Sequence, residues 1–341
     1  MKIVAYGDVH IHPFNEFSRM TDSGLTNRVE IALQSLRWVF DYAKANNVDR
    51  LINMGDLFES PKMINTEIAS ALVEVLGEYN FKYHDFIMGN HDIMDWGHKY
   101  NVAKVFSKYY NIIDANNYQD KGRFDCGFVY LPYLHNCYPA IDWLKSLPKE
   151  GKEGTYVFGH WSIDGVKYTE DYPVSTNALQ SLFDDFELST FGHIHLRQIL
   201  GAEKKIVYPG SLLTHSFKSA KGGKGAILID TQLKTWEFLD NPYSPKFEIL
   251  EIRKKEDLEK PITEFTRIRV VKDLLPYLEK RLEELNLKVS VSTINEVQLS
   301  NRTIKVDSTW SDSQIVSAYI KDNEMKKSSN RYTNSLLRSV K

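Results

Sequence analysis

The side chains best suited to chemistry lie in short polar clusters that directly follow apolar runs. One cluster, Asn90, His91 and Asp92, comes after Gly89 and the apolar residues 86–88. Glycine allows the backbone to turn sharply where a strand ends. The turn therefore presents an amide, an imidazole and a carboxylate at the edge where open α/β sheets bind ligands. A capped loop can have the same composition, so this cluster alone does not establish a site.

The same arrangement recurs at four other places along the chain. The polar residues that follow a glycine there are Asp8 and His10, Asp56, His160, and His193 and His195. Two side chains separated by one residue point the same way on an extended segment, so Asp8 with His10, and His193 with His195, can each offer two ligands to one metal ion. Five of the ten histidines fall in these clusters, which scatter over a surface would not produce.

Each of these residues also has an ordinary structural interpretation, since a lone histidine at a strand end is usually only hydrogen-bonded. Taken together, imidazole, carboxylate and amide ligands suit Mn, Fe or Zn better than a Ca or Mg cage. Asp8 and Asp56 cannot neutralise two divalent cations, so such a centre stays positive and attracts a phosphate. The clusters therefore predict a two-metal site for in-line attack on phosphorus.

Hydrophobic periodicity predicts the elements that must position these clusters. Apolar runs at residues 3–6, 50–54 and 86–88 alternate with helical periodicity at 28–46 and 64–79. This order predicts an α/β fold with parallel strands joined by right-handed crossovers. A short helix is predicted at residues 177–186. Further strands are predicted at residues 128–131, 155–158, 188–191, 207–208, 226–230 and 235–239.

Composition limits the class of protein. The chain has 341 residues, a formal net charge of -2 and 42% hydrophobic residues, which is enough for one large and one smaller domain. This charge excludes binding of nucleic acid by the net charge of the whole protein, although a local basic surface could still bind it. Two cysteines fit a reducing compartment. With no apolar leader or membrane-length segment, we expect a cytoplasmic protein, in the host cytoplasm if it is viral, with no membrane contact.

The ordered clusters resemble a known family. The succession Asp-x-His, Gly-Asp, Gly-Asn-His-Asp, Gly-His and Gly-His-x-His, over residues 1 to about 240, is similar to the calcineurin-like metallophosphoesterase superfamily. Within it, Gly-Asp-Leu-Phe at 55–58 and Tyr-Pro-Gly-Ser at 208–211 resemble the SbcD-type (Mre-type) DNA repair exonuclease subunits, phage members among them. This resemblance implies a two-layer mixed β-sandwich flanked by helices, with a small α+β C-terminal capping domain.

The resemblance also implies roles for the clustered residues. It gives one metal ion Asp8, His10 and His195, and the other Asn90, His160 and His193, with Asp56 bridging the two. His91 would protonate the leaving oxygen and Asp92 would orient it. The metal ions are expected to be Mn²⁺, with Mg²⁺, Fe²⁺ and Zn²⁺ as alternatives.

Two positions depart from the pattern of these nucleases. Glu59 stands where a histidine or aspartate is common, and Ile11, His12 and Pro13 replace a Leu-Gly. Both positions lie where DNA strands would be guided, so these departures concern the handling of the substrate rather than the metal chemistry.

The resemblance divides the chain into three parts. Residues 1–253 would form the nuclease domain, closed by a strand at 245–252, and 253–257 would be a solvated linker. Residues 254–305 would form the capping domain, with a strand at 265–271, a helix at 274–285 and a strand at 288–291. Residues 306–341 would be a helical, basic tail that binds a partner or touches DNA, although a solvated end fits equally well.

The function expected from these features is a two-metal phosphodiesterase acting on DNA. It would be an exonuclease or endonuclease subunit in DNA repair or recombination, working with an SMC-like ABC ATPase, and a homodimer is left open. A phosphoesterase for small molecules or phosphoproteins is the main alternative, because it needs the same metals but no capping domain. A scaffold with a degraded site is disfavoured, because no expected ligand residue is missing.

Overall fold

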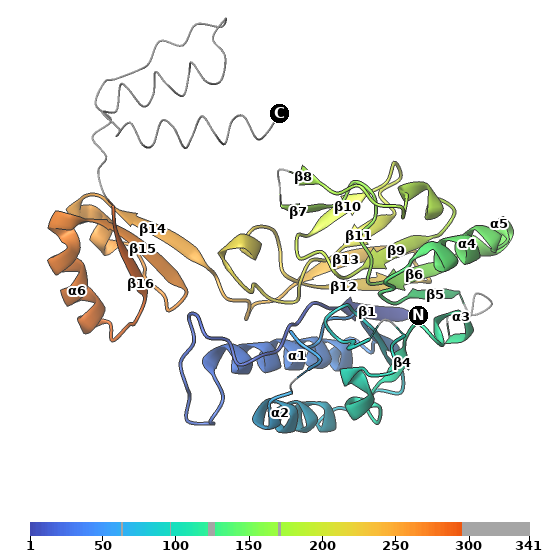
Figure 1. Ribbon diagram of the computed structural model, residues 1–341, viewed down its shortest axis with the longest axis horizontal. Coiled ribbons are helices and arrows are strands. Elements are labelled where there is room, and N and C mark those ends of the chain that lie inside the picture. The colour runs from blue at the N-terminus through green and yellow to red at the C-terminus, as the bar shows by residue number, and fades with distance from the viewer. Residues whose placement is uncertain (63, 96, 122–126, 170–171, 295–341) are drawn as a thin grey trace, which may run out of the picture.

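The structure is a computed structural model that describes residues 1–62, 64–95, 97–121, 127–169 and 172–294. A larger body contains two sheets that pack face to face, and a smaller domain follows it (Figure 1). The first sheet has the strand order β13 (Thr235–Asp240), β12 (Gly225–Asp230), β1 (Lys2–Tyr6), β2 (Arg50–Asn53), β3 (His84–Ile87) and β4 (Asn111–Ile113). The second sheet has the order β10 (Gln198–Leu200), β11 (Ile206–Tyr208), β9 (Leu188–Phe191), β6 (Tyr156–Gly159) and β5 (Phe128–Leu131).

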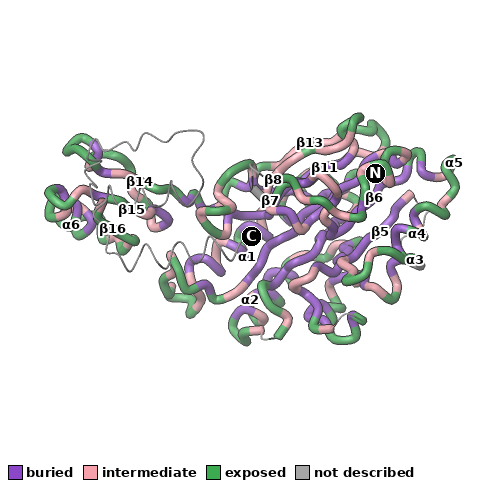
Figure 2. Tube along the Cα trace, turned by 45° about the horizontal axis from the view of Figure 1, so that its top comes forward, coloured by how far each residue is buried: buried purple, intermediate pink, exposed green. Residues whose placement is uncertain are grey.

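The core lies between these two sheets and beneath the helices that cover the first one. Ile3 of β1 packs in one cluster with Val157 of β6, which joins the sheets. Its neighbour Val4 faces the other way, into a cluster with residues of α1 (Asn27–Ala45) and α2 (Thr66–Gly77). Both faces of β1 are therefore buried, as a nearly continuous apolar run predicts. Figure 2 shows buried chain running through the centre of this body.

The predicted fold is confirmed as a mixed β-sandwich flanked by helices. Strands β1 to β4 are parallel, as are β5, β6, β9 and β11, while β10, β12 and β13 pair antiparallel. Thr26 and Asn65 begin α1 and α2 because their side chains accept backbone N–H groups of the first turn. The other helices of the larger body are α3 (Tyr118–Lys121), α4 (Tyr138–Ser146) and α5 (Lys149–Lys152).

Several local elements were predicted wrongly or not at all. The helix predicted at residues 177–186 is wrong, because that segment contains only a 3₁₀ turn at Gln180–Leu182. Strand β4 was not predicted; it is short and follows another 3₁₀ turn, Val102–Phe106. A hairpin of β7 (Lys167–Thr169) and β8 (Tyr172–Pro173) was also missed, because its strands of three and two residues are too short to show an alternating pattern.

The smaller domain is a parallel sheet of β14 (Glu248–Ile252), β15 (Thr266–Val271) and β16 (Ser290–Ile294), covered by α6 (Leu275–Glu284). Its core joins Ile252, Ile268 and Val270 to Leu278 and Leu282 of the helix. The strand, helix and strand predicted between residues 265 and 291 are therefore confirmed. The remaining residues of the predicted capping domain from 295 onward, and all of the predicted tail, lie outside the described residues.

Two predictions about the start of this domain need correction. The segment 245–252 does not close the larger body, because β14 pairs with β15 of the smaller sheet. The predicted solvated linker at 253–257 is exposed at residues 253–256 but is folded, since Asp257 is buried and its carboxylate accepts the backbone N–H groups of Arg253 and Lys254. These two bonds begin the 3₁₀ turn Lys255–Glu259. The smaller domain therefore begins upstream of the predicted boundary.

Aromatic rings join the smaller domain to the larger body. Phe247, just before β14, lies 5.7 Å from Phe17, 5.2 Å from Phe217 and 5.2 Å from Phe265, measured between ring centroids. The Arg28 guanidinium of α1 lies 5.3 Å from the centroid of Phe247. Such contacts between a cation and a ring stabilise partly buried junctions.

No helix within the described ranges has both the length and the apolar character needed to cross a lipid bilayer.

Candidate metal centre

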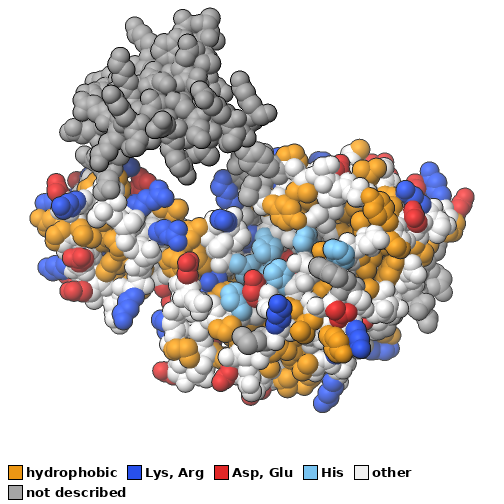
Figure 3. Space-filling model, in the orientation of Figure 1, with side chains coloured by type: hydrophobic (Ala, Val, Ile, Leu, Met, Phe, Trp, Pro, Cys, Tyr) orange, Lys and Arg blue, Asp and Glu red, His pale blue; other side chains and the backbone are white. Residues whose placement is uncertain are grey.

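The polar clusters meet because they follow parallel strands of two facing sheets. Asp8 and His10 come after β1, Asp56 after β2, Asn90, His91 and Asp92 after β3, His160 after β6, and His193 and His195 after β9. The carboxyl ends of parallel strands lie at one edge of each sheet, and here both edges face the same space. Figure 3 shows histidine side chains gathered in a hollow of the larger body, close to the smaller domain.

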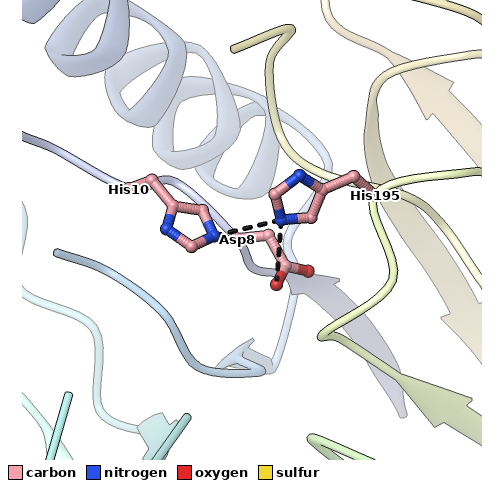
Figure 4. A group of neighbouring side chains, drawn as sticks. All are labelled: Asp8, His10 and His195. Carbon is pink, nitrogen blue, oxygen red and sulfur yellow. Dashed lines mark hydrogen bonds and ion pairs between the residues drawn. The ribbon is translucent and has the colours of Figure 1, made fainter. Parts of the chain in front are cut away.

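The first group of predicted ligands is Asp8, His10 and His195. One ligand atom from each lies within 4.8 Å of the others. Figure 4 shows the two rings turned toward one another, with the Asp8 carboxylate beside them. His10 Nε2 lies 3.0 Å from His195 Nε2, which in turn lies 3.9 Å from an Asp8 oxygen. Donor atoms from two sheets therefore converge on one point.

The second group is Asn90, His160 and His193. His193 Nδ1 lies 2.8 Å from the side-chain oxygen of Asn90 and 3.3 Å from His160 Nε2. His160 Nε2 lies 3.1 Å from that same oxygen. These three donors come from strands β3, β6 and β9, and the sandwich brings them to one place.

Asp56 lies between the two groups. Its Oδ2 atom is 3.2 Å from His160 Nε2 and 3.7 Å from His10 Nε2, so one carboxylate reaches both sets of donors. Its Oδ1 atom accepts the backbone N–H of His91 at 2.8 Å, which fixes the carboxylate. This is the position that a bridging ligand requires.

The backbone at these residues is not extended, which corrects one expectation. Asp8, His10, Asp56 and His193 have φ values of 52°, 47°, 54° and 80°, in the left-handed region. Residues other than glycine adopt this conformation rarely and at a cost, and it is concentrated at functional sites. The pairs Asp8-x-His10 and His193-x-His195 therefore reach the site through tight turns, and not by the alternation of a strand.

Two glycines allow the loops to approach one another. A Cβ at Gly89 would overlap the Oδ1 and backbone nitrogen atoms of Asp56, and a Cβ at Gly55 would lie 2.8 Å from the backbone nitrogen of Gly89. Gly55 also has φ +102°. The glycines before Asp56 and Asn90 are therefore required by close packing of the β2 and β3 loops.

Asp92 does not orient His91 as predicted. It is fully buried, and its carboxylate accepts backbone N–H groups from Asp56 at 2.7 Å, Gly89 at 2.9 Å and Leu57 at 3.1 Å. Burial, with the charge of Asp56 added, raises the pKa of Asp92 to about 7. Asp92 thus ties the β2 loop to the β3 loop, and its effect on the site passes through the backbone of Asp56.

His91 is held by a different residue. Its Nδ1 donates to the backbone oxygen of Glu59 at 2.7 Å, which leaves Nε2 as the nitrogen available for other contacts. The ring lies edge-on to His10, 4.8 Å between centroids, and lines the same cavity as the metal-binding groups. A ligand atom of His91 is also within 4.8 Å of His10 and Asp56, so its predicted role as a proton donor stays a prediction.

The donor set fits two cations. His160 Nδ1 donates to the backbone oxygen of Met54 at 2.6 Å, and His10 Nδ1 lies 2.8 Å from the Glu59 carboxylate. When these rings are neutral, the Nε2 lone pairs face the interior of the site. Imidazole nitrogen with carboxylate and amide oxygen is a ligand set that Mn, Fe and Zn accept. The residues present therefore fit the metal ions that the sequence predicts.

Burial and mutual charge shift the titration of the site. Burial raises the pKa of Asp8 to about 6, against the attraction of the positive charge on His160 when that ring is protonated. Burial would also raise the pKa of Asp56, but the same charge on protonated His160 holds it well below its usual range. Burial lowers the pKa of both His193 and His195 to about 3. These two rings are therefore neutral near pH 7, the form in which imidazole binds a metal ion.

Two further residues of the site were missed from the sequence. His215 Nε2 donates to the backbone oxygen of Asp8 at 2.9 Å, and its ring lies 5.1 Å from that of His10. The Lys224 ammonium donates to the backbone oxygen of His195. Neither residue follows a strand directly, although His215 lies four residues after the Tyr-Pro-Gly-Ser motif, which is the only local signal for it.

An open cavity of about 720 Å³ gives access to the centre. Part of each proposed ligand group lines it, together with His91 and the loop at residues 215–219; the lining ligands are His10, Asp56, Asn90, His193 and His195. Lys218 and Lys221 stand in this wall and add positive charge. The cavity is therefore suited to an anionic substrate that approaches His91 and the ligand groups together.

Comparisons with known proteins identify a matching family and a relative of this chain. A family model described as calcineurin-like phosphoesterase matches residues 1–197. Exonuclease subunit 1 of Enterobacteria phage T4 is 22% identical over 257 residues, which covers 71% of this chain and 68% of that protein. A solved structure described as a dimetal phosphatase from Danio rerio aligns with a TM-score of 0.40 and 10% identity, covering 67% of this chain and 91% of that one.

Proposed function

Because the chain belongs to the calcineurin-like phosphoesterase family, and is thus a phosphoester hydrolase that uses divalent metals, we propose that it is a two-metal phosphodiesterase acting on DNA. The observation that carries this proposal is the pair of ligand groups that share Asp56 beside His91. A diester phosphate needs charge neutralisation, an activated water and a proton donor for the leaving oxygen, all within a few ångströms. Groups that could perform these tasks line one cavity, which supports the proposal.

In this proposal Asp8, His10 and His195 hold one ion, and Asn90, His160 and His193 hold the other, with Asp56 shared. Two bound Mn²⁺ ions would supply the activated water and positive charge at the phosphate. His91 acts as the general acid. Its Nδ1–H is engaged by the Glu59 backbone oxygen, so the proton that it delivers to the leaving oxygen comes from Nε2.

DNA is the proposed substrate for two reasons. The phage T4 relative, which covers 71% of this chain, is named an exonuclease subunit. The cavity is open, has Lys218 and Lys221 in its wall, and lies next to the smaller domain, so it can admit a polymer. We further propose that the smaller domain caps the DNA, that residues 306–341 bind a partner, and that the partner is an SMC-like ATPase. This last step extends the resemblance of the motifs.

A nuclease assay tests the proposal. The full chain would be stripped of metal, supplied with Mn²⁺ and incubated with end-labelled single-stranded and double-stranded DNA. The expected result is metal-dependent shortening of at least one of these substrates, together with hydrolysis of bis-p-nitrophenyl phosphate. Hydrolysis of p-nitrophenyl phosphate with no cleavage of either DNA would contradict the proposal and favour a phosphatase for small molecules or phosphoproteins.

A further inference from the structure

Two side chains outside the proposed ligand set lie against the far nitrogens of ligand histidines, one in each half of the centre. Glu59 Oε2 is 2.8 Å from His10 Nδ1, an ion-pair contact whose angle lies outside that of a regular hydrogen bond, and the Tyr168 hydroxyl forms a hydrogen bond of 3.0 Å with His193 Nε2. In both rings the opposite nitrogen faces the other donors of its group. A neutral imidazole carries its proton on the nitrogen that faces an acceptor, so these partners decide which nitrogen has the free lone pair.

We propose that Glu59 and Tyr168 are positioning residues, Glu59 for the Asp8–His10–His195 half and Tyr168 for the Asn90–His160–His193 half. The inference rests on the proposed function, because it takes both groups to hold metal ions. Partners that bind the far nitrogen of a ligand histidine fix the orientation and tautomer of the ring, and removing them costs metal affinity.

Glu59 is anchored for this role. Its neighbour Phe58 forms a bridge with Ile11, and the backbone oxygen of Glu59 accepts the Nδ1–H of His91. The side chain then reaches back to His10, although 45% of it is exposed. A half-exposed glutamate adds little to the core, so its contact with His10 is best explained by the site. Glu59 therefore contacts both His10, a proposed metal ligand, and His91, the proposed general acid.

Tyr168 is placed by the hairpin of β7 and β8. Its hydroxyl lies 3.0 Å from the Ser162 hydroxyl as well as 3.0 Å from His193 Nε2. A hydroxyl can accept one hydrogen bond while donating another, so it can take the Nε2–H of His193 and donate to Ser162. That leaves His193 Nδ1, which is 2.8 Å from the Asn90 oxygen, as the nitrogen with the free lone pair. The Tyr168 side chain is itself half-exposed.

The effects of Glu59 and Tyr168 can be measured separately, because each residue acts on only one of the two ligand groups. Mn²⁺ binding to the full chain would be measured by calorimetry in two backgrounds, His195→Ala, which damages the first half, and Asn90→Ala, which damages the second. Glu59→Ala and Tyr168→Phe would be added to each, so that each variant is the control for the other. A residue that acts through one ligand has no further effect once that half is lost.

In the Asn90→Ala background, Glu59→Ala should weaken Mn²⁺ binding by about 10- to 100-fold, and Tyr168→Phe should leave it unchanged. In the His195→Ala background the pattern should reverse. Glu59→Gln, which keeps an acceptor for the His10 Nδ1–H, should lose less affinity than Glu59→Ala. The thermal midpoints of the Glu59 and Tyr168 variants in chelator should match their backgrounds, because both side chains are about half-exposed.

Equal effects of a variant in both backgrounds, or unchanged affinity in both, would overturn the positioning roles while leaving the metal centre intact. A shift of the thermal midpoint in chelator that accounts for the weakened binding would also overturn them. Failure of the unmodified chain to bind Mn²⁺ would instead overturn the proposed function. The two failures are thus distinguishable.

Discussion

Replacing Asp92 with asparagine separates the role that the structure gives this residue from the role predicted from the sequence. In the structure, three backbone N–H groups from two loops converge on a fully buried carboxylate. An asparagine has one carbonyl oxygen and one NH₂ group in the same space. If the oxygen takes the place of Oδ2, the N–H groups of Asp56 and Gly89 keep an acceptor, but that of Leu57 faces another donor.

The expected loss of stability follows from these three bonds. An unsatisfied buried donor costs about 1–3 kcal/mol, and two bonds that change from a charged to a neutral acceptor each lose about 1 kcal/mol. The sum is about 3–5 kcal/mol, a large part of the roughly 5–15 kcal/mol that stabilises a folded protein. Asparagine also removes the cost of burying a charge, which the raised pKa of Asp92 reflects, so this sum is an upper limit. Because a chain of this size has a urea m-value above about 3 kcal/mol/M, the midpoint should fall by no more than about 1 M.

The assay is urea unfolding of the metal-stripped chain, followed by circular dichroism at pH 8. This pH is chosen because the pKa of Asp92 is about 7, so the carboxylate is mostly charged there. Asp95→Asn is the matched control, since Asp95 also accepts three backbone N–H groups but in contact with water, and its midpoint should move much less. An unchanged midpoint in Asp92→Asn with slow hydrolysis would refute this reasoning and restore the orienting role.

Three further predictions follow from other contacts. Burial lowers the pKa of His84 from 6.5 to about 3, so only the unfolded chain takes up its proton between these values, and stability is lost as the pH falls through that window. Between pH 7 and pH 5, the free energy of unfolding measured by urea titration should fall by about 2 kcal/mol more in the wild type than in His84→Gln. Equal decreases in the two proteins would exclude His84 as the cause. Gly89→Ala should weaken Mn²⁺ binding at least about tenfold by calorimetry, because the added methyl group displaces Asp56, and normal affinity would show that the loops can relax. His91→Ser should keep both Mn²⁺ ions but slow hydrolysis by about 10²- to 10⁴-fold in a steady-state assay, whereas loss of an ion would make His91 a ligand.

The sequence could predict that the site residues meet, because each of them is marked by its immediate neighbours in the sequence. Each apolar strand, its glycine and the polar residue after it are adjacent in sequence, and the geometry of parallel strands brings their ends together. Residues as far apart as Asp8 and His195 could thus be assigned to one place. The left-handed turn at Asp8 could not be predicted in this way, because it depends on neighbours from other loops, such as the His193 N–H that its carboxylate accepts.

The sequence could not predict the roles of residues whose hydrogen-bond partners lie far away along the chain. The Asp92 carboxylate sits in a histidine-rich cluster, yet its partners include backbone N–H groups 35 and 36 residues away. Tyr168 and His215 reach the site from a hairpin and a loop that carry no ligand motif. Strand β14 was predicted as a strand but assigned to the larger body and not to the smaller domain. Its residue pattern does not indicate the strand with which it pairs.

A titration of the metal-stripped full chain with Mn²⁺, followed by hydrolysis of bis-p-nitrophenyl phosphate, tests the two-metal centre most directly. The protein concentration would be kept well above the dissociation constants, so that activity reports equivalents bound. The shared Asp56 and the two flanking ligand groups predict that activity rises to a plateau only when two equivalents per chain are present. A plateau at one equivalent, or full activity without added metal, would contradict the account.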